Sequence, residues 1–357
     1  MIKRYVYLLL ALCASLFSET QGWSQCCAPP MQCCDCNYDY FAVGPSRLTV
    51  RSELLYFQPT MDQSYYVISS TNNFFSGNFF PDGTRHNNTA PYKPGYRVEA
   101  LYDLCNGVNE FDFRFTSFTG GHTSSVAGPV LFDTIGYPGD GAQSPEDTFN
   151  NGFSKTKGSF KYYAGDATFN RLFLDCFPEN FTFLFGLHYA YIQFKQNFSS
   201  GGFFLDHEAL LANSQHLTSE SHFWGVGPQF GLDYRYNFEW CDAEVVSVFG
   251  NCRAALLCSN TKSNFHYDTL RTGSVGVNIR NEPLIRITPT IDARLGLSYN
   301  FCCLSYEANI ELGYELVWYS NSIDSIVGLD VAFPGNTIDA FSSLNLQGPF
   351  LALSLRF

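Results

Sequence analysis

The chain has 357 residues, and its 33 acidic residues outnumber its 21 basic ones, which gives a formal net charge of -12 at pH 7. This balance leaves no basic patch for a phosphate backbone, so it excludes nucleic acid as a partner. Aromatic residues make up 17% of the chain while helical periodicity is almost absent, and this combination favours an all-β protein over a soluble α/β enzyme.

The N-terminus carries an export signal. Lys3 and Arg4 precede an apolar run of about a dozen residues, and small and polar residues follow at 18–22. A membrane-spanning helix needs about 20 apolar residues, so the run indicates a cleaved leader. We predict a signal peptide at residues 1–22, a cysteine-rich periplasmic segment at 23–46 and the folded domain at 47–357.

After the leader, short segments alternate apolar and polar residues. Residues 96–104, for example, place Tyr96 and Val98 on one face and Arg97 and Glu99 on the other, because successive side chains of a strand point to opposite faces. Short turns and long polar connections follow one another in strict alternation, as in outer-membrane barrels. Ten strands are predicted, at residues 47–58, 96–104, 110–116, 159–173, 180–194, 223–237, 245–258, 284–301, 304–318 and 348–357.

The closing segment is the most informative. Leu351, Leu353, Leu355 and the terminal Phe357 share one parity. An alternating strand that ends on an aromatic residue, behind an export signal, is typical of bacterial outer-membrane barrels. We therefore predict an all-β fold: a transmembrane antiparallel β-barrel with an even number of strands, about 10 and in the range 10–14. Outer-membrane lipid and the barrel assembly machinery are its expected partners, and Phe357 is the expected assembly signal.

An even strand number places both ends of the barrel domain in the periplasm and the long connections outside. Segments 64–80 and 126–135 could each add a hairpin, which accounts for the upper end of the range. The alternative is a soluble β-sandwich or a lipid-free barrel, which needs no aromatic residues near strand ends. The membrane barrel is favoured by the aromatic side chains found there: Tyr96, Trp224, Tyr299, Phe301, Trp318 and Tyr319.

Three stretches carry a resemblance to a known family: residues 51–57 (RSELLYF), 223–233 (FWGVGPQFGLD) and 311–318 (ELGYELVW). Over nearly the whole mature chain, the sequence resembles the Legionella-type major outer membrane protein family, which includes chlamydial relatives of the major outer membrane porin. The resemblance implies an outer-membrane, pore-forming barrel. It transfers no catalytic site, and we predict that the chain is not an enzyme and binds no cofactor or metal.

The cysteines gather on the side predicted to be periplasmic. An oxidising envelope favours disulfides, and two interpretations remain open: internal bridges, or intermolecular links to Cys-rich envelope proteins, which the chlamydial resemblance implies. Homo-oligomers are a further expectation. The disulfide candidates in the N-terminal segment and at the short turns are Cys26, Cys27, Cys33, Cys34, Cys36, Cys105, Cys176, Cys241, Cys302 and Cys303.

Charged side chains on the inward parity are the candidate functional residues. One interpretation is a wet pore wall that sets ion preference; the other is a plug of salt bridges, because about eight strands enclose only side chains. The predicted pore-lining residues are Arg97, Glu99, Asp103, Glu110, Asp112, Arg114, Asp233, Arg235, Arg253, Arg286, Asp292, Arg294, Glu307, Glu311, Glu315 and Arg356.

The histidines do not indicate a catalytic or metal site. His207, His216 and His222 share a predicted external loop with acidic residues, but their spacing fits no ligand motif, and only residues 206–213 there suggest a short helix. His188 stands alone on a strand and is expected to point inward. A diffusion porin is the first functional prediction, a structural or adhesive surface barrel without an open pore the second, and an outer-membrane hydrolase the third.

Overall fold

The computed structural model describes residues 47–357 apart from short segments at 62–64, 71–83, 88–89, 105–107, 134–147, 177–178, 207–208, 242–243, 270–274, 304–305 and 330–336. The signal peptide and the cysteine-rich segment expected at residues 1–46 lie outside the described residues. No helix in the described part of the chain is long and apolar enough to cross a membrane.

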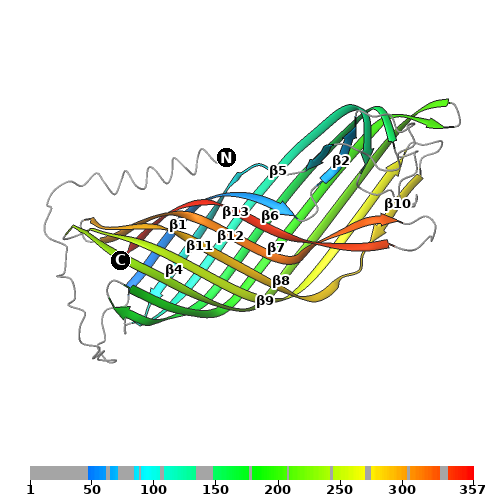
Figure 1. The fold of residues 1–357 in the computed structure, drawn as a ribbon. Coiled ribbons are helices and arrows are strands. Elements are labelled where there is room, and N and C mark those ends of the chain that lie inside the picture. Colours follow the sequence, from blue (N-terminus) through cyan, green and yellow to red (C-terminus); the bar gives the residue numbers. More distant parts are fainter. Residues whose placement is uncertain are drawn as a thin grey trace.

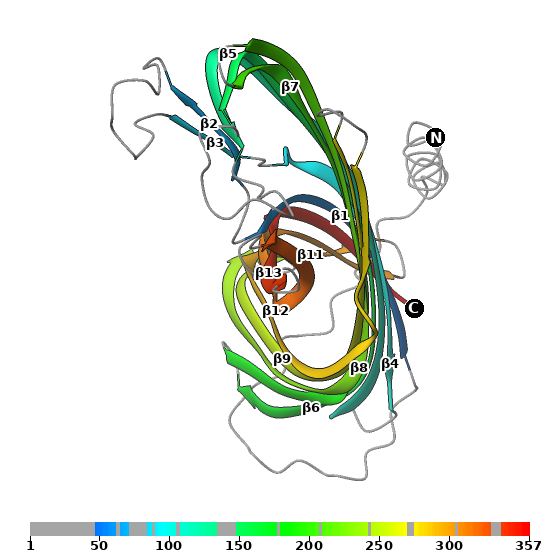
Figure 2. The ribbon, with the colours of Figure 1, turned by 90° about the vertical axis from the view of Figure 1, so that its right-hand side faces the viewer.

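Ten antiparallel strands close into a barrel (Figures 1 and 2). Thirteen strands form one sheet, and three of them, β2, β3 and β10, lie off the ring. The ring closes where β1 pairs with β13, for example through Val50 and Leu355. The predicted fold and strand number are confirmed. The ring strands are β1 Arg47–Met61, β4 Lys93–Asp103, β5 Asn109–Asp133, β6 Thr148–Cys176, β7 Glu179–Asp206, β8 Ala209–Cys241, β9 Glu244–Thr269, β11 Leu284–Cys303, β12 Tyr306–Leu329 and β13 Thr337–Arg356.

The remaining strands extend the wall at one end of the barrel (Figure 1). β2 (Tyr65–Ser70) pairs with β3 (Thr84–Asn87) and with the last residues of β5, and β10 (Val275–Arg280) pairs with the last part of β9. The hairpin expected from the segment at 64–80 therefore begins with β2, but it lies beside the ring and leaves the ring number at ten.

The two ends of the barrel differ. At the turn end, β1 begins and β13 ends, and the Phe357 N–H donates a hydrogen bond to the Leu48 carbonyl at 2.9 Å. The four short connections predicted from the sequence join strands at this same end, for example between β6 and β7. The opposite end, which we call the loop end, carries β2, β3 and β10.

Strands β5 to β9 continue at the loop end well past the predicted boundaries. The predicted loop at 119–158 is largely the paired parts of β5 and β6, and the short helix expected at 206–213 is wrong, because β7 and β8 pair continuously to Asp206 and Ala209. Alternation continues there, since Phe198 and Leu217 are buried on the inner face. A composition rich in Ser, Asn and Gly hid this pairing, so the connection between β7 and β8 is short and not long.

Apolar side chains cover the outer face of the ring. Phe113 is 58% exposed, whereas its neighbour Asp112 is fully buried inside, which is the inverse of a soluble protein and the arrangement that lipid requires. We call this surface the lipid belt. Trp318 and Trp224 lie on it, but the expected position of Tyr319 in an interfacial girdle is wrong, because Tyr319 belongs to the inner face and is fully buried.

The interior has two layers, and in several strands, such as β1, β5, β6 and β12, the charged residues lie on the turn-end side and the apolar residues on the loop-end side. Along β12, for example, Glu315 is followed by Val317 and Tyr319. The ionic layer consists of Arg51, Glu53, Arg97, Glu99, Asp112, Arg114, Asp166, Arg253, Asp292, Arg294, Glu311 and Glu315. The apolar layer consists of Leu55, Phe57, Phe118, Phe160, Tyr162, Ile192, Phe223, Leu257, Tyr319, Leu344 and Leu346.

Candidate functional site: the barrel interior

The ionic layer brings together residues that the sequence predicted to line a pore. They lie on the inner face because they alternate with lipid-belt residues along each strand. Their exposures are at most 8%, so their charges are sheltered from solvent and depend on one another. Nine predicted residues belong to this layer: Arg97, Glu99, Asp112, Arg114, Arg253, Asp292, Arg294, Glu311 and Glu315.

Arg114 joins opposite walls of the barrel. Its Nε lies 2.6 Å from Asp166 Oδ2 on the neighbouring strand β6, and its Nη2 lies 2.9 Å from Asp292 Oδ2 on β11. β5 and β11 are five strands apart around the ring of ten. A single guanidinium therefore spans the lumen at this level.

Arg97 is the centre of a second cluster. Its Nη1 lies 2.9 Å from Glu53 Oε2, its Nη2 lies 2.5 Å from Glu315 Oε1, and its Nε donates to Thr116 Oγ1 at 2.8 Å. Arg294 also contacts Glu53, at 3.0 Å, and its guanidinium lies 4.1 Å from the centre of the Phe350 ring. Arginine suits these positions because its planar fork can hold two carboxylates at once.

Three members of the ionic layer were not predicted from the sequence: Arg51, Glu53 and Asp166. Arg51 lies 2.5 Å from Glu311 and 2.8 Å from Glu53. All three residues alternate with lipid-belt residues along their strands. The same inward parity that identified the other charges could therefore have identified these three. What the sequence could not supply was the identity of their partners, which come from strands up to 260 residues away.

Several predicted pore-lining residues lie nearer the turn end and are less buried. Arg356 contacts Asp103 at 2.5 Å and the exposed Glu307 at 3.4 Å. Arg235 pairs with Glu311 at 2.9 Å.

Two further predicted residues accept hydrogen bonds from asparagine amides: Glu110 from Asn170 at 2.7 Å, and Asp233 from Asn251 at 3.1 Å. Arg286 stands apart toward the loop end, with its guanidinium 4.2 Å from the centre of the Phe341 ring. The predicted set is therefore spread along the barrel axis and does not form one constriction.

His188 points inward as expected, but it is not alone. Its Nδ1 lies 2.6 Å from Asp166 Oδ1, and its Nε2 lies 2.8 Å from the Tyr319 hydroxyl. The Tyr319 hydroxyl is also 2.9 Å from that of Tyr162. This chain links the two layers. A His–Asp pair is a familiar catalytic element, but His188 is only 5% exposed and is enclosed between the layers, so the pair acts here as a structural link.

The apolar layer also contains a contact between opposite walls of the barrel. Tyr162 and Tyr319 come from β6 and β12, which are also five strands apart, and their ring centres are 5.8 Å apart. Phe57 contacts Phe118, and Phe223 contacts Tyr319, at similar ring distances. Buried aromatic rings at these separations form a packed core.

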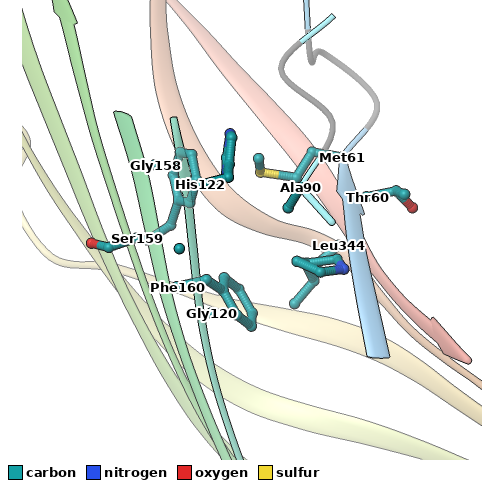
Figure 3. A pocket seen from close by; sticks show the side chains of 12 residues that line it. Thr60, Met61, Ala90, Gly120, His122, Gly158, Ser159, Phe160 and Leu344 are labelled. Atoms are coloured by element: carbon teal, nitrogen blue, oxygen red, sulfur yellow. The ribbon is translucent and has the colours of Figure 1, made fainter. Parts of the chain in front are cut away.

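A small pocket opens at the loop end, above the apolar layer (Figure 3). Met61, His122, Phe160 and Leu344 are among its lining residues, and its volume is about 40 Å³. Sites for small organic ligands are usually several hundred Å³, so this cavity has room for a few water molecules only. Burial lowers the pKa of the His122 imidazole, which packs against Gly158.

The disulfide candidates are only partly within the described residues. Cys26, Cys27, Cys33, Cys34, Cys36 and Cys105 lie outside them. The backbone places Cys176, Cys241, Cys302 and Cys303 at strand ends on the turn end. Their pairing stays a prediction, as does the role of Phe357 in assembly. Cys252 and Cys258 are free thiols on the outer face of β9.

The predicted external histidine loop is replaced by strand. His216 and His222 lie on the outer face of β8, while His207 and Glu208 lie outside the described residues. His222 Nε2 is 3.2 Å from Glu220 Oε1, a contact between neighbours on one strand face. Among the residues that the structure describes, no group of three or more His, Cys, Asp or Glu side chains could hold a metal ion.

Comparison with known proteins agrees with this architecture. Residues 44–357 match the sequence profile of the family described as Legionella pneumophila major outer membrane protein precursor, which confirms the resemblance found in the sequence. No curated protein matches the chain. The family match and the closed ring with its lipid belt identify an outer-membrane β-barrel.

Similar solved structures are distant. The outer membrane protease OmpT from Escherichia coli has 9% identity and a TM-score of 0.42, covering 87% of this chain and 96% of its own. A FadL homologue from Pseudomonas aeruginosa has 9% identity and a TM-score of 0.26, with 87% and 90% covered. The toluene transporter TbuX from Ralstonia pickettii has 7% identity and a TM-score of 0.22, with 88% and 89% covered. At these values the activities named for those proteins carry no argument about this chain.

Proposed function

We propose that this chain, which belongs to the Legionella pneumophila major outer membrane protein family, is a structural barrel of the outer membrane whose lumen is closed. In this proposal it anchors a tall β-wall in the membrane and presents that wall at the cell surface. Passive diffusion through the single chain is not its main activity.

The contact between Arg114 and Asp292 carries the proposal. It joins walls five strands apart at 2.9 Å, and the Tyr162–Tyr319 contact repeats such a closure in the apolar layer. Ten strands enclose little more space than the eight that side chains fill completely. In the described part of the interior, a hydrated solute would have to displace both layers to pass.

The second candidate is the diffusion porin that the sequence predicts first. Its support is a run of inward charges of both signs from Asp103 near the turn end to Arg286 near the loop end. Such a wall suits the passage of small ions with weak selectivity. For this function the ion pairs must separate and the aromatic rings must move aside.

A surface role is supported by the length of the strands. β8 has 33 residues, whereas a tilted strand crosses a bilayer in about 9–11. From Trp224 to Phe238 the outward side chains of β8 are mostly apolar, and from His222 to His216 they are polar. We infer that this polar part projects from the membrane, with the loop end outside and the turn end, including its cysteines, in the periplasm.

Conductance in planar bilayers tests the closed lumen. We expect purified, heat-modifiable protein to insert without stable single-channel steps, while a general porin in the same bilayers serves as the positive control. Regular, long-lived steps that scale with protein concentration would reject the closed barrel and establish the porin. Protease digestion of intact cells tests the orientation separately, since it should cleave loop-end connections and spare those of the turn end.

A further inference from the structure

Basic residues of the described barrel lie both in its interior and on its outer face, and most of the lysines are on the outer face. Five arginines lie in the ionic layer, where each contacts carboxylates: Arg51, Arg97, Arg114, Arg253 and Arg294. Of the seven lysines in the sequence, Lys3 lies in the leader and Lys93 is the first residue of β4. The other five lie on the outer face of neighbouring strands in the loop-end half: Lys155, Lys157 and Lys161 on β6, Lys195 on β7 and Lys262 on β9.

An aromatic row marks where the lipid belt ends on these strands. Tyr163, Tyr191 and Trp224 occupy directly paired positions on β6, β7 and β8. The rings of Tyr163 and Tyr191 lie with their centres 6.1 Å apart. Tyr and Trp side chains of this kind lie at the boundary between hydrocarbon and headgroups, so this row is the loop-end edge of the belt.

The lysines begin at the next outward position. Lys161 pairs with Gln193, Gln193 with His222, and His222 with Lys262, which forms one polar row directly above the aromatic one. Lys195 pairs with Ser159 on β6, and it is therefore diagonal to both Lys157 and Lys161. Diagonal neighbours on a sheet face are about 7–8 Å apart, close enough for three ammonium groups to surround one phosphate.

These lysines have no competing partners within the described part of the barrel. No described carboxylate lies within ion-pair distance of Lys157, Lys161 or Lys195. The nearest acidic position is Glu220, which pairs across the strands with Lys195 but contacts Gln193 Nε2 at 2.9 Å and His222 at 3.2 Å. In a chain with a net charge of -12, this face is a local concentration of unpaired positive charge.

We propose that Lys157, Lys161 and Lys195 form a binding surface for the phosphorylated headgroup of a glycolipid in the outer leaflet. The surface continues from the lipid belt, so the acyl chains of the ligand would lie on the aromatic row while its phosphates reach the lysines. Lysine suits this position because its compact, strongly hydrated charge makes favourable contacts with phosphate at a wet boundary. The inference rests on the proposed orientation, with the loop end facing outward.

Titration of detergent-folded protein with fluorescent, bisphosphorylated lipid A tests the surface. Each lysine close to an anionic membrane surface contributes about fivefold, so the triple variant Lys157→Gln, Lys161→Gln, Lys195→Gln should bind about 100-fold more weakly. The matched control is Arg171→Gln, because Arg171 is an exposed cation on the same face of β6 but at the turn end. It should bind as the native chain does, and lysine-to-arginine replacements at the three positions should retain most of the affinity.

A second variant should change the affinity in the opposite direction, and its result does not depend on whether the triple variant folds. Glu220→Gln removes the acidic neighbour of Lys195 and should tighten binding. Dephosphorylated lipid A should bind poorly to the native protein, and inorganic phosphate at the same concentration should not compete. Undiminished binding by the triple variant, equal binding of the dephosphorylated lipid, or equal competition by inorganic phosphate would each overturn the proposal. Failure here leaves the conductance test of the closed lumen unaffected.

Discussion

The ionic layer and the apolar layer fill the interior of the same barrel by different means. In the ionic layer, Arg114 and Asp292 meet across the lumen with defined atoms at 2.9 Å, and each charge depends on a particular partner. In the apolar layer, Phe57, Phe118 and Phe223 fill space without such directional demands. Contacts in the first layer join particular strands, and the second layer supplies non-directional burial.

This difference determines how each layer should respond to damage. Burying a charge is costly unless it is paired, so removing one member of an ion-pair cluster leaves its partners uncompensated. Removing an apolar side chain leaves a cavity whose cost depends on its size and on how far the surroundings relax. Four substitutions distinguish these responses, and their expected effects decrease from Arg97→Ala to Gly158→Ala.

Arg97→Ala should have the largest effect. It removes one of the two guanidinium groups that the buried Glu53 and Glu315 share, the other being that of Arg294. We expect the free energy of unfolding to fall by about 3–5 kcal/mol. Urea unfolding of detergent-folded protein measures this change. Arg171→Ala, on the exposed face of β6, should stay within about 0.5 kcal/mol of the native chain. Equal effects of the two variants would mean that the charges of the ionic layer are not buried away from solvent.

Leu257→Ala tests the apolar layer. Leu257 is fully buried, and its truncation should lower the free energy of unfolding by about 3 kcal/mol through lost burial and a residual cavity. The loss should be nearly independent of salt. The control is Leu256→Ala. Leu256 is on the same strand but points outward toward lipid, with 55% of its surface exposed. If Leu257→Ala costs no more than Leu256→Ala, the loop-end interior is not packed.

Tyr319→Phe cuts the link between the layers. It removes the hydroxyl that meets both His188 and Tyr162 while leaving the ring in the apolar layer. We expect a loss of about 1–2 kcal/mol, because buried polar atoms lose a partner. A double-mutant cycle with His188→Phe measures the coupling. Additive effects in the cycle would indicate that the two layers are energetically independent.

Gly158→Ala should have the smallest effect, about 1 kcal/mol. A Cβ at this position would lie 2.4 Å from His122 Cε1, and we expect the His122 ring to turn outward to relieve this contact. Burial lowers the pKa of His122, so the native fold loses stability as pH falls below the unfolded value of about 6.5.

In the Gly158→Ala variant the His122 ring lies in solvent, so its protonation no longer destabilises the folded state at acid pH. The cost of Gly158→Ala should therefore be larger at pH 8 than at pH 5, and unfolding in urea at the two pH values measures it. A cost that rises toward acid pH would contradict the burial of His122.

Sequence patterns predicted the fold more accurately than they predicted the lengths of the strands. The parity of Leu351, Leu353 and Leu355 correctly identified the outward face of the closing strand, and the four short turns were correctly assigned to one end. The loop-end parts of β7 and β8 were missed because their outward side chains face water and not lipid. There, pairing with a neighbouring strand decides the structure, and composition alone resembles a loop.

The candidate site shows the same division. Inward parity correctly grouped Arg97, Arg114 and Asp292, because alternation is a local property of the backbone. Whether those charges line a channel or bridge it depends on the distance between strands that are far apart in sequence. Tyr319 illustrates the point: its place near a strand end suggested a lipid-facing girdle, but a change of one residue in parity directs it to the centre of the barrel.

By itself, the sequence determined the all-β class, the ring of ten, the lipid-facing surface and the charged inner face, because each follows from alternation and turn positions within a few residues. Only the tertiary structure decided that Arg114 reaches Asp292, that Tyr162 meets Tyr319, and that Lys195 lies beside Lys157 and Lys161. These contacts arise from register and closure, since the shear of the ring selects which distant residues share a level. The physical reason is that the backbone of one strand sets the directions of its side chains. The distances between side chains on different strands are set only when the sheet closes.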